Sequence, residues 1–151
     1  MAKMHSRKRG NAHSNRPLNP QVPTWIRYQT KELEMIIGKL SKEGKTASEI
    51  GLILRDSYGI PNTKLITGKR IQQLLADKKL LPEIPEDLMA LMRKSVRLRK
   101  HMELFKQDQT SKRGLLLTES KIKRLIKYYK EVGKLGPLWK YDPAKIKIYA
   151  E

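Results

Sequence analysis

A histidine, an aspartate and a serine stand at short intervals in a cationic stretch of the 151-residue sequence. His101 precedes Asp108 by seven residues, about two helical turns, and Ser111 follows three residues later. A carboxylate accepts hydrogen bonds and a hydroxyl both donates and accepts them, so such groups can read base edges in a nucleic acid. Equally, Asp108 and Ser111 can simply cap a helix while His101 lies at the surface. The spacing leaves both interpretations open.

The same three residue types occur in hydrolase triads, but the sequence does not favour catalysis. A triad needs a buried pocket and an oxyanion hole, and a turn between two cationic helices offers neither. The sequence has no G-x-S-x-G or H-E-x-x-H motif and no Cys, and its three His residues are scattered. The segment Thr67–Lys69 lacks the earlier glycine of a phosphate loop, since residue 63 is Thr. We therefore predict no enzyme activity, no metal site and no cofactor.

The charge balance indicates a polyanionic partner. The chain carries 33 Lys and Arg against 15 Asp and Glu, a net charge of +18. Residues 93–134 alone contain fourteen Lys and Arg and only four Asp and Glu. Cations at fixed spacing on a helix follow a phosphate backbone and release counterions, so we predict nucleic-acid binding. No apolar run approaches the roughly 20 residues of a membrane span, which predicts a soluble intracellular chain without a membrane partner.

Apolar residues recur at helical spacing and nowhere at strand spacing, which predicts an all-α fold. The two longest stretches should form an antiparallel hairpin of helices, each about 30 Å long. A short helix is also expected after Asp142. The two hairpin helices are expected over Glu86–Lys106 and Ser111–Val132. Three shorter helices are expected before them: one capped by Thr30 and stopped by Gly44, one from the Thr46 capping box to Gly59, and one over Thr67–Lys78.

Composition divides the chain into three parts: residues 1–23, 24–82 and 83–151. The first part has five basic residues and no acidic one, so it is predicted to be a disordered tail that contacts phosphates. Its candidate contacts are Arg7, Lys8, Arg9 and Arg16. The second is expected to be a subdomain of short helices, and the third a helical bundle built on the long hairpin.

The short helices also allow an alternative, a sequence-specific DNA-binding helix-turn-helix protein. Lys69 and Arg70 would then begin the recognition helix. The connection Ile60–Thr63 is longer than the usual tight turn, which argues against it. Among the aromatic residues, we predict that Trp25 packs structurally rather than stacks on a base, and that Tyr129 is buried and Tyr128 exposed.

Two runs carry a family resemblance: RKHMELFKQDQTSKRGLLL from Arg99 and KRLIKYY from Lys123. They resemble the small-ribosomal-subunit protein family numbered fifteen in bacteria and archaea. The segments PTWI at Pro23 and EIGLILRDSYGI at Glu49 are similar to its archaeal and eukaryotic branch, called the thirteenth protein in eukaryotic small subunits. The resemblance covers essentially the whole chain, and its most specific element is the turn motif H-x6-D-x2-S-x-R-G.

The resemblance implies an RNA-binding helical bundle that binds the central domain of the small-subunit rRNA directly and early in assembly. Implied partners are the three-way junction with its adjoining duplex, neighbouring small-subunit proteins and, across the subunit interface, large-subunit rRNA. The implied location is the cytoplasm, within the small ribosomal subunit. Family members grip a duplex minor groove with the His, Asp and Ser of the turn. The implied rRNA-binding residues are His101, Asp108, Ser111, Arg113, Arg124, Tyr128 and Lys94.

One segment departs from the family pattern. Bacterial members have a Thr-Gly-Ser loop before the hairpin, whereas this chain has Pro82–Asp87, which contains three acidic residues. Acidic side chains there would repel phosphate. The bacterial junction contacts are therefore not expected to be retained residue by residue.

Overall fold

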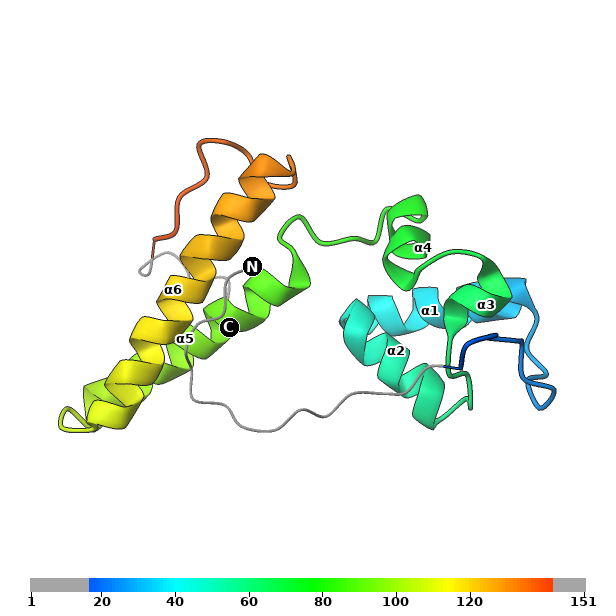
Figure 1. Cartoon of the computed structure of the whole chain (residues 1–151), viewed down its shortest axis with the longest axis horizontal. Coiled ribbons are helices and arrows are strands. Elements are labelled where there is room, and N and C mark those ends of the chain that lie inside the picture. Colours follow the sequence, from blue (N-terminus) through cyan, green and yellow to red (C-terminus); the bar gives the residue numbers. More distant parts are fainter. Residues whose placement is uncertain (1–16, 143–151) are drawn as a thin grey trace. The chain divides into compact units, whose positions relative to one another are not determined.

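The computed structural model of the protein describes residues 17–142, and over this range it contains six helices and no strand. Figure 1 shows these helices. The predicted all-α class is confirmed. The chain forms two compact units that divide between Pro82 and Glu83. We call residues 17–82 the N-terminal unit and residues 83–142 the C-terminal unit. The proposed basic tail up to Arg16 and the expected helix after Asp142 lie outside the described residues.

The N-terminal unit is built from four short helices around one apolar core. They are α1 (Thr30–Lys42), α2 (Ala47–Asp56), α3 (Thr63–Thr67) and α4 (Ile71–Asp77). Helix α1 packs against both α2 and α4. Burying leucine and isoleucine side chains at about 25 cal/mol per Å² supplies the main stabilisation. The buried core residues are Leu33, Ile37, Leu40, Ile50, Leu54, Ile60, Leu74 and Leu75.

The first two helices begin at capping residues. At α2 the predicted capping box is confirmed: the hydroxyl of Thr46 accepts from the Glu49 N–H at 3.3 Å, and the Glu49 carboxylate accepts from the Thr46 N–H at 2.9 Å. Helix α1 begins one residue earlier than predicted, because Gln29 is the N-cap and Thr30 the first helical residue. Helix α2 ends at Asp56 rather than at Gly59.

The predicted helix over Thr67–Lys78 is wrong at its start. The chain instead forms α3, breaks at Gly68 and resumes as α4 at Ile71. Gly68 has φ +73°, a left-handed conformation that side-chain-bearing residues adopt at a cost. The break separates the apolar residues of α4 from Thr67, so these form a helix of only seven residues.

The C-terminal unit is a helical hairpin of α5 (Glu86–Leu104) and α6 (Gln109–Glu131). The two long helices lie side by side (Figure 1), and the short connection makes them antiparallel, as predicted. Their starts and ends fall within two residues of the expected ones. The buried core residues are Leu88, Met92, Val96, Ile122, Leu125, Ile126, Tyr129 and Leu135.

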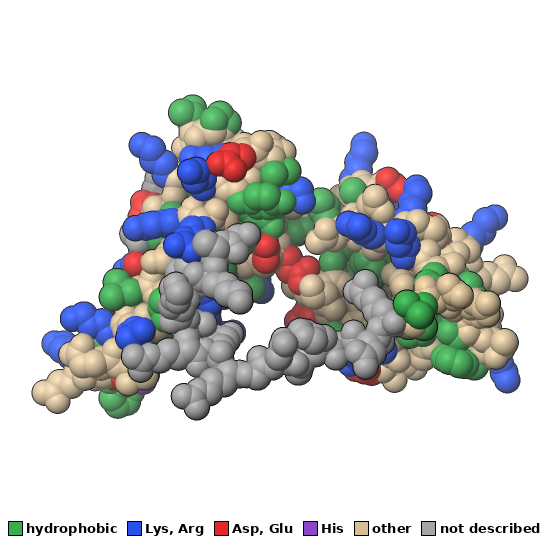
Figure 2. All heavy atoms as spheres, viewed as in Figure 1, with side chains coloured by type: hydrophobic (Ala, Val, Ile, Leu, Met, Phe, Trp, Pro, Cys, Tyr) green, Lys and Arg blue, Asp and Glu red, His purple; other side chains and the backbone are tan. Residues whose placement is uncertain are grey.

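Basic side chains outnumber acidic ones in the described part of both units. Figure 2 shows Lys and Arg around the visible face of each unit, with fewer Asp and Glu. Over residues 17–142, no helix combines the length and the apolar character that crossing a membrane requires.

Candidate functional site

The structure brings together the three residues at the closed end of the hairpin. Asp108 is the N-cap of α6, and its Oδ1 accepts from the Ser111 N–H at 3.0 Å. Its Oδ2 accepts from the Ser111 hydroxyl at 2.6 Å and lies 3.0 Å from His101 Nε2. Asp108 therefore caps α6, as one of the two interpretations expected, and it also orients two polar side chains. The reading of base edges by these residues stays a prediction.

These contacts keep Asp108 ionised. The hydroxyl and backbone N–H of Ser111 and the imidazole of His101 hold the pKa of the Asp108 carboxyl well below its usual range. Hydrogen bonds to a carboxylate stabilise its charged form. Of the roughly four acceptor positions on a carboxylate, three are used here. Asp108 therefore mainly orients its neighbours and keeps one position for an outside donor.

The hydrogen-bond directions leave specific groups for a ligand. The Ser111 hydroxyl donates to Asp108, so the lone pairs of its oxygen remain as acceptors. Ser111 and Asp108 are partly exposed, and so is His101. The closed end of the hairpin thus presents the Ser111 oxygen as a hydrogen-bond acceptor, because the hydroxyl hydrogen is already used in the bond to Asp108.

Two further contacts, which sequence spacing did not reveal, support this end of the hairpin. The ring of Phe105 lies against that of His101, with centroids 4.8 Å apart. Arg99 of α5 forms an ion pair with Glu119 of α6, and both side chains are partly buried. The pair joins residues on facing helices, so it fixes one helix against the other close to His101.

The other predicted residues of this unit lie along the hairpin. Arg113, Arg124 and Lys94 are exposed, and Tyr128 is 50% exposed. At 1.5 Å per residue, Arg124 lies about 20 Å along α6 from Ser111. The structure therefore does not bring Arg124 and Tyr128 to the closed end. It places them toward the opposite end of the same helix.

At that open end, an acidic residue has an internal role. The Tyr129 hydroxyl donates to Asp87 Oδ2 at 2.6 Å, and Asp87 Oδ1 accepts from the Leu88 N–H at 2.8 Å. Burial and the Asp87 charge raise the pKa of the Tyr129 hydroxyl. Tyr129 is 8% exposed and its ring lies 5.3 Å from that of Tyr128, so both tyrosines are placed as predicted. Asp87 at the start of α5 thus binds Tyr129 of α6, whereas the sequence suggested only that its charge would repel phosphate.

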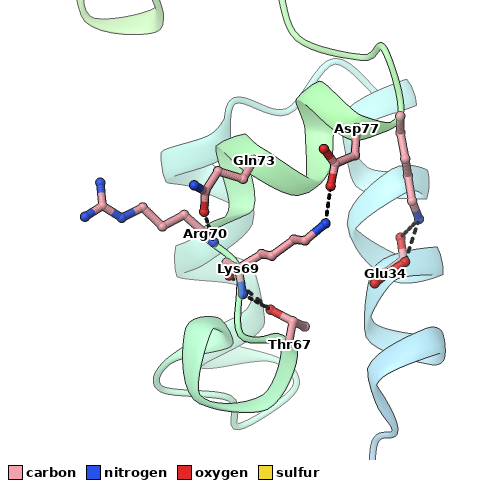
Figure 3. Close-up of polar contacts among 7 residues, drawn as sticks. Glu34, Thr67, Lys69, Arg70, Gln73 and Asp77 are labelled. Atoms are coloured by element: carbon pink, nitrogen blue, oxygen red, sulfur yellow. Dashed lines mark hydrogen bonds and ion pairs between the residues drawn. The ribbon is translucent and has the colours of Figure 1, made fainter.

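The N-terminal unit gives no support to a DNA-recognition helix. Figure 3 shows Lys69 directed toward Asp77 and Arg70 extending away from the other labelled side chains. The Lys69 ammonium lies 2.6 Å from the Asp77 carboxylate. Lys69 is therefore partly neutralised, and α4 is short for a helix that lies in a major groove.

The remaining predicted contacts lie outside the described residues: Arg7, Lys8, Arg9 and Arg16. No group of three or more His, Asp or Glu side chains within residues 17–142 is arranged to hold a metal ion.

Comparisons with known proteins match both parts of the chain to ribosomal proteins. The ribosomal S13/S15 N-terminal domain family matches residues 1–60, and the ribosomal protein S15 family matches residues 71–149. The small ribosomal subunit protein uS15 of Sulfolobus acidocaldarius is 46% identical over 142 residues, which cover 94% of this chain and 93% of the relative. Its counterpart in Metallosphaera sedula is 49% identical over the same shares.

These matches confirm the resemblance carried by the turn motif. They also confirm the prediction that the chain is not an enzyme, because the relatives are ribosomal proteins. With more than half of the chain matched by one family model and close to half of its residues identical to those of full-length relatives, the chain belongs to the ribosomal protein S15 family.

Proposed function

We propose that the protein is a structural constituent of the small ribosomal subunit that binds the central domain of small-subunit rRNA directly and early in assembly. The observation that carries the proposal is the closed end of the hairpin, where Asp108 holds Ser111 and His101 between two cationic helices. The proposed partners are the three-way junction with its adjoining duplex and neighbouring small-subunit proteins. A contact with large-subunit rRNA across the subunit interface is proposed as well, and the location is the cytoplasm.

The geometry supports recognition in a minor groove. An A-form duplex has a deep, narrow major groove and a wide, shallow minor groove. The guanine amino group is the donor that distinguishes G·C pairs in the minor groove. Because the Ser111 hydroxyl already donates to Asp108, its oxygen meets such a donor as an acceptor. The remaining acceptor position on Asp108 favours the same partner, so we propose that this end selects guanine.

The basic residues supply the rest of the affinity. Lys94, Arg113 and Arg124 are exposed on the two long helices, where cations can follow phosphates on either side of the groove. Tyr128 is proposed to contact the RNA at the open end. Arg7, Lys8, Arg9 and Arg16 are proposed to contact rRNA phosphates from the tail.

Inosine lacks the guanine amino group and tests the proposal. In a central-domain duplex, guanosines are replaced by inosine one at a time, and binding is measured for the unsubstituted protein and for Ser111→Ala. We expect one inosine to weaken binding of the unsubstituted protein about tenfold, and Ser111→Ala to lose this discrimination. Arg113→Ala serves as the control, since losing a phosphate contact should weaken binding to both RNAs equally and reduce the salt slope. An unsubstituted protein that binds every inosine duplex as tightly as the parent contradicts the proposal.

A further inference from the structure

The segment before α1 places an indole ring in water. Residues Pro23–Ile26 form a turn in which the Ile26 N–H donates to the Pro23 carbonyl at 3.3 Å. Ile26 packs against the core of the N-terminal unit. Trp25, the residue before it, is 67% exposed. The turn thus directs Ile26 into the core and leaves the larger side chain of Trp25 in solvent.

The exposed ring is nevertheless held in place. Its Nε1–H donates to the Gly59 carbonyl at 3.0 Å, and Gly59 adopts φ +66° in the loop after α2. Three residues further on, the Tyr28 ring meets that of Tyr58 edge-on, with centroids 5.7 Å apart. Two contacts therefore join the segment to the same loop, and the hydrogen bond to Gly59 fixes the direction of the Trp25 ring.

A purely structural tryptophan would bury its ring, because the apolar area of an indole is its main contribution to stability. Here the hydrogen bond uses only the N–H edge, and two thirds of the residue stay open to solvent. Trp25 therefore has a structural contact with Gly59, as expected, but most of its ring stays in water. An aromatic ring that is exposed but already oriented loses little conformational entropy on binding, which is a property of a stacking platform.

The surrounding charge identifies the ligand class. Arg27 is exposed two residues away and has no ion-pair partner within the described part of the chain. Within the N-terminal unit, residues 17–82 carry 11 Lys and Arg against 6 Asp and Glu, so an anionic ligand is attracted to the surface of this unit. Single-stranded nucleic acids combine phosphates with flat bases, and aromatic rings beside cations bind them by stacking.

We propose that Trp25 is a stacking site for an unpaired nucleobase of single-stranded RNA, with Arg27 beside it to contact the phosphate. The site lies in the N-terminal unit and is separate from the duplex site of the hairpin. It goes beyond the proposed function, because it binds a different form of RNA through a different unit.

Fluorescence tests the proposal directly, since Trp25 and Trp139 are the two tryptophans of the chain. In the full chain with Trp139→Phe, all tryptophan emission comes from Trp25. A short single-stranded oligoribonucleotide should quench this emission, whereas an abasic ribose-phosphate oligomer of equal length and charge should not. Trp25→Leu should weaken binding of the oligoribonucleotide about tenfold, the usual effect of losing one stacked base.

A matched variant separates stacking from folding. Trp25→Phe loses the hydrogen bond to Gly59 but keeps a ring, so it should retain most of the affinity even if Trp25→Leu unfolds the unit. Equal quenching by the abasic oligomer would show that phosphates alone are bound and would overturn the proposal. Emission that is unchanged by RNA but altered by neighbouring small-subunit proteins would overturn it too, by identifying a protein contact.

The two sites can fail independently. Ser111→Ala should leave binding of the single-stranded oligomer unchanged, and Trp25→Phe should leave the guanosine-to-inosine discrimination of the duplex unchanged. Loss of single-strand binding in Ser111→Ala would contradict a separate site, whereas an absence of inosine discrimination with normal Trp25 quenching would refute only the duplex proposal.

Discussion

The hydrogen bond between Tyr129 and Asp87 provides a quantitative test of the C-terminal unit. It joins α6 to the start of α5 at 2.6 Å, and the acceptor is a carboxylate. A hydrogen bond to a charged group contributes about 1.5–3 kcal/mol, and its removal costs most when a buried group is left unsatisfied. Asp87 keeps the Leu88 N–H and is exposed, so water can replace the lost donor. We therefore expect Tyr129→Phe to cost about 1.5 kcal/mol, the lower end of that range.

The assay is urea unfolding monitored by Trp139, which packs against the core of the C-terminal unit, in a Trp25→Phe background. For a small domain, 1 kcal/mol corresponds to about 4–8 °C in melting temperature, so thermal melts should agree. Tyr128→Phe is the matched control, because Tyr128 is the neighbouring residue and is 50% exposed. Equal stability of Tyr129→Phe and Tyr128→Phe would refute the reasoning.

The same contact predicts a pH dependence. The folded state raises the pKa of Tyr129 above its ordinary value of about 10. Its contribution to stability is therefore complete below pH of about 10 and is lost as the pH rises toward the folded-state pKa. Tyr129→Phe should remove this alkaline loss. A loss of equal size in both proteins, measured by unfolding at several alkaline pH values, would contradict it.

The other predictions concern the remaining contacts. Asp108 has a lowered pKa in the folded state, so its contribution to the free energy of unfolding is present above about pH 4 and is lost on acidification below it. Asp108→Asn should therefore reduce the acid-induced loss of stability, measured by urea unfolding between neutral and acidic pH. Thr46→Ala should cost about 1 kcal/mol in chemical unfolding by removing the α2 cap, whereas Thr46→Ser should cost far less. Gly68→Ala should destabilise the protein by about 1 kcal/mol because of its positive φ, while Gly114→Ala, inside α6 with open space around it, should stabilise it by about 0.5–1 kcal/mol. If thermal melts showed that both glycine variants shift the melting temperature in the same direction, the assigned backbone conformations would be contradicted.

The sequence predicts those features that depend on local pattern. Apolar residues at helical spacing give α1, α5 and α6 nearly at their observed limits. The capping box at Thr46 and the exposed and buried positions of Tyr128 and Tyr129 follow from the same periodicity. At the candidate site, Asp108 follows His101 by seven residues, or two helical turns, but α5 ends at Leu104. The two side chains meet because the turn brings Asp108, the N-cap of α6, back to His101.

The features that were missed depend on backbone conformation or on distant contacts. A helix that begins at Thr67 fits the apolar spacing, but Gly68 takes a left-handed conformation and ends α3. Asp87 and Tyr129 are 42 residues apart in sequence, and no local signal pairs them. The orientation of the Trp25 ring similarly depends on the hydrogen bond to Gly59, which is 34 residues away. Sequence spacing alone does not tell whether a tryptophan held in this way is buried.

The most direct test of the central claim is binding to an rRNA central-domain fragment that contains the three-way junction. A scrambled duplex of equal length is titrated in parallel across a salt series. We predict that junction binding persists at salt concentrations that release the scrambled duplex, because the contacts of Ser111 and Asp108 add to the phosphate contacts. Equal affinity for both RNAs, with the same steep salt dependence, would show that charge alone determines binding and would contradict specific recognition by the hairpin.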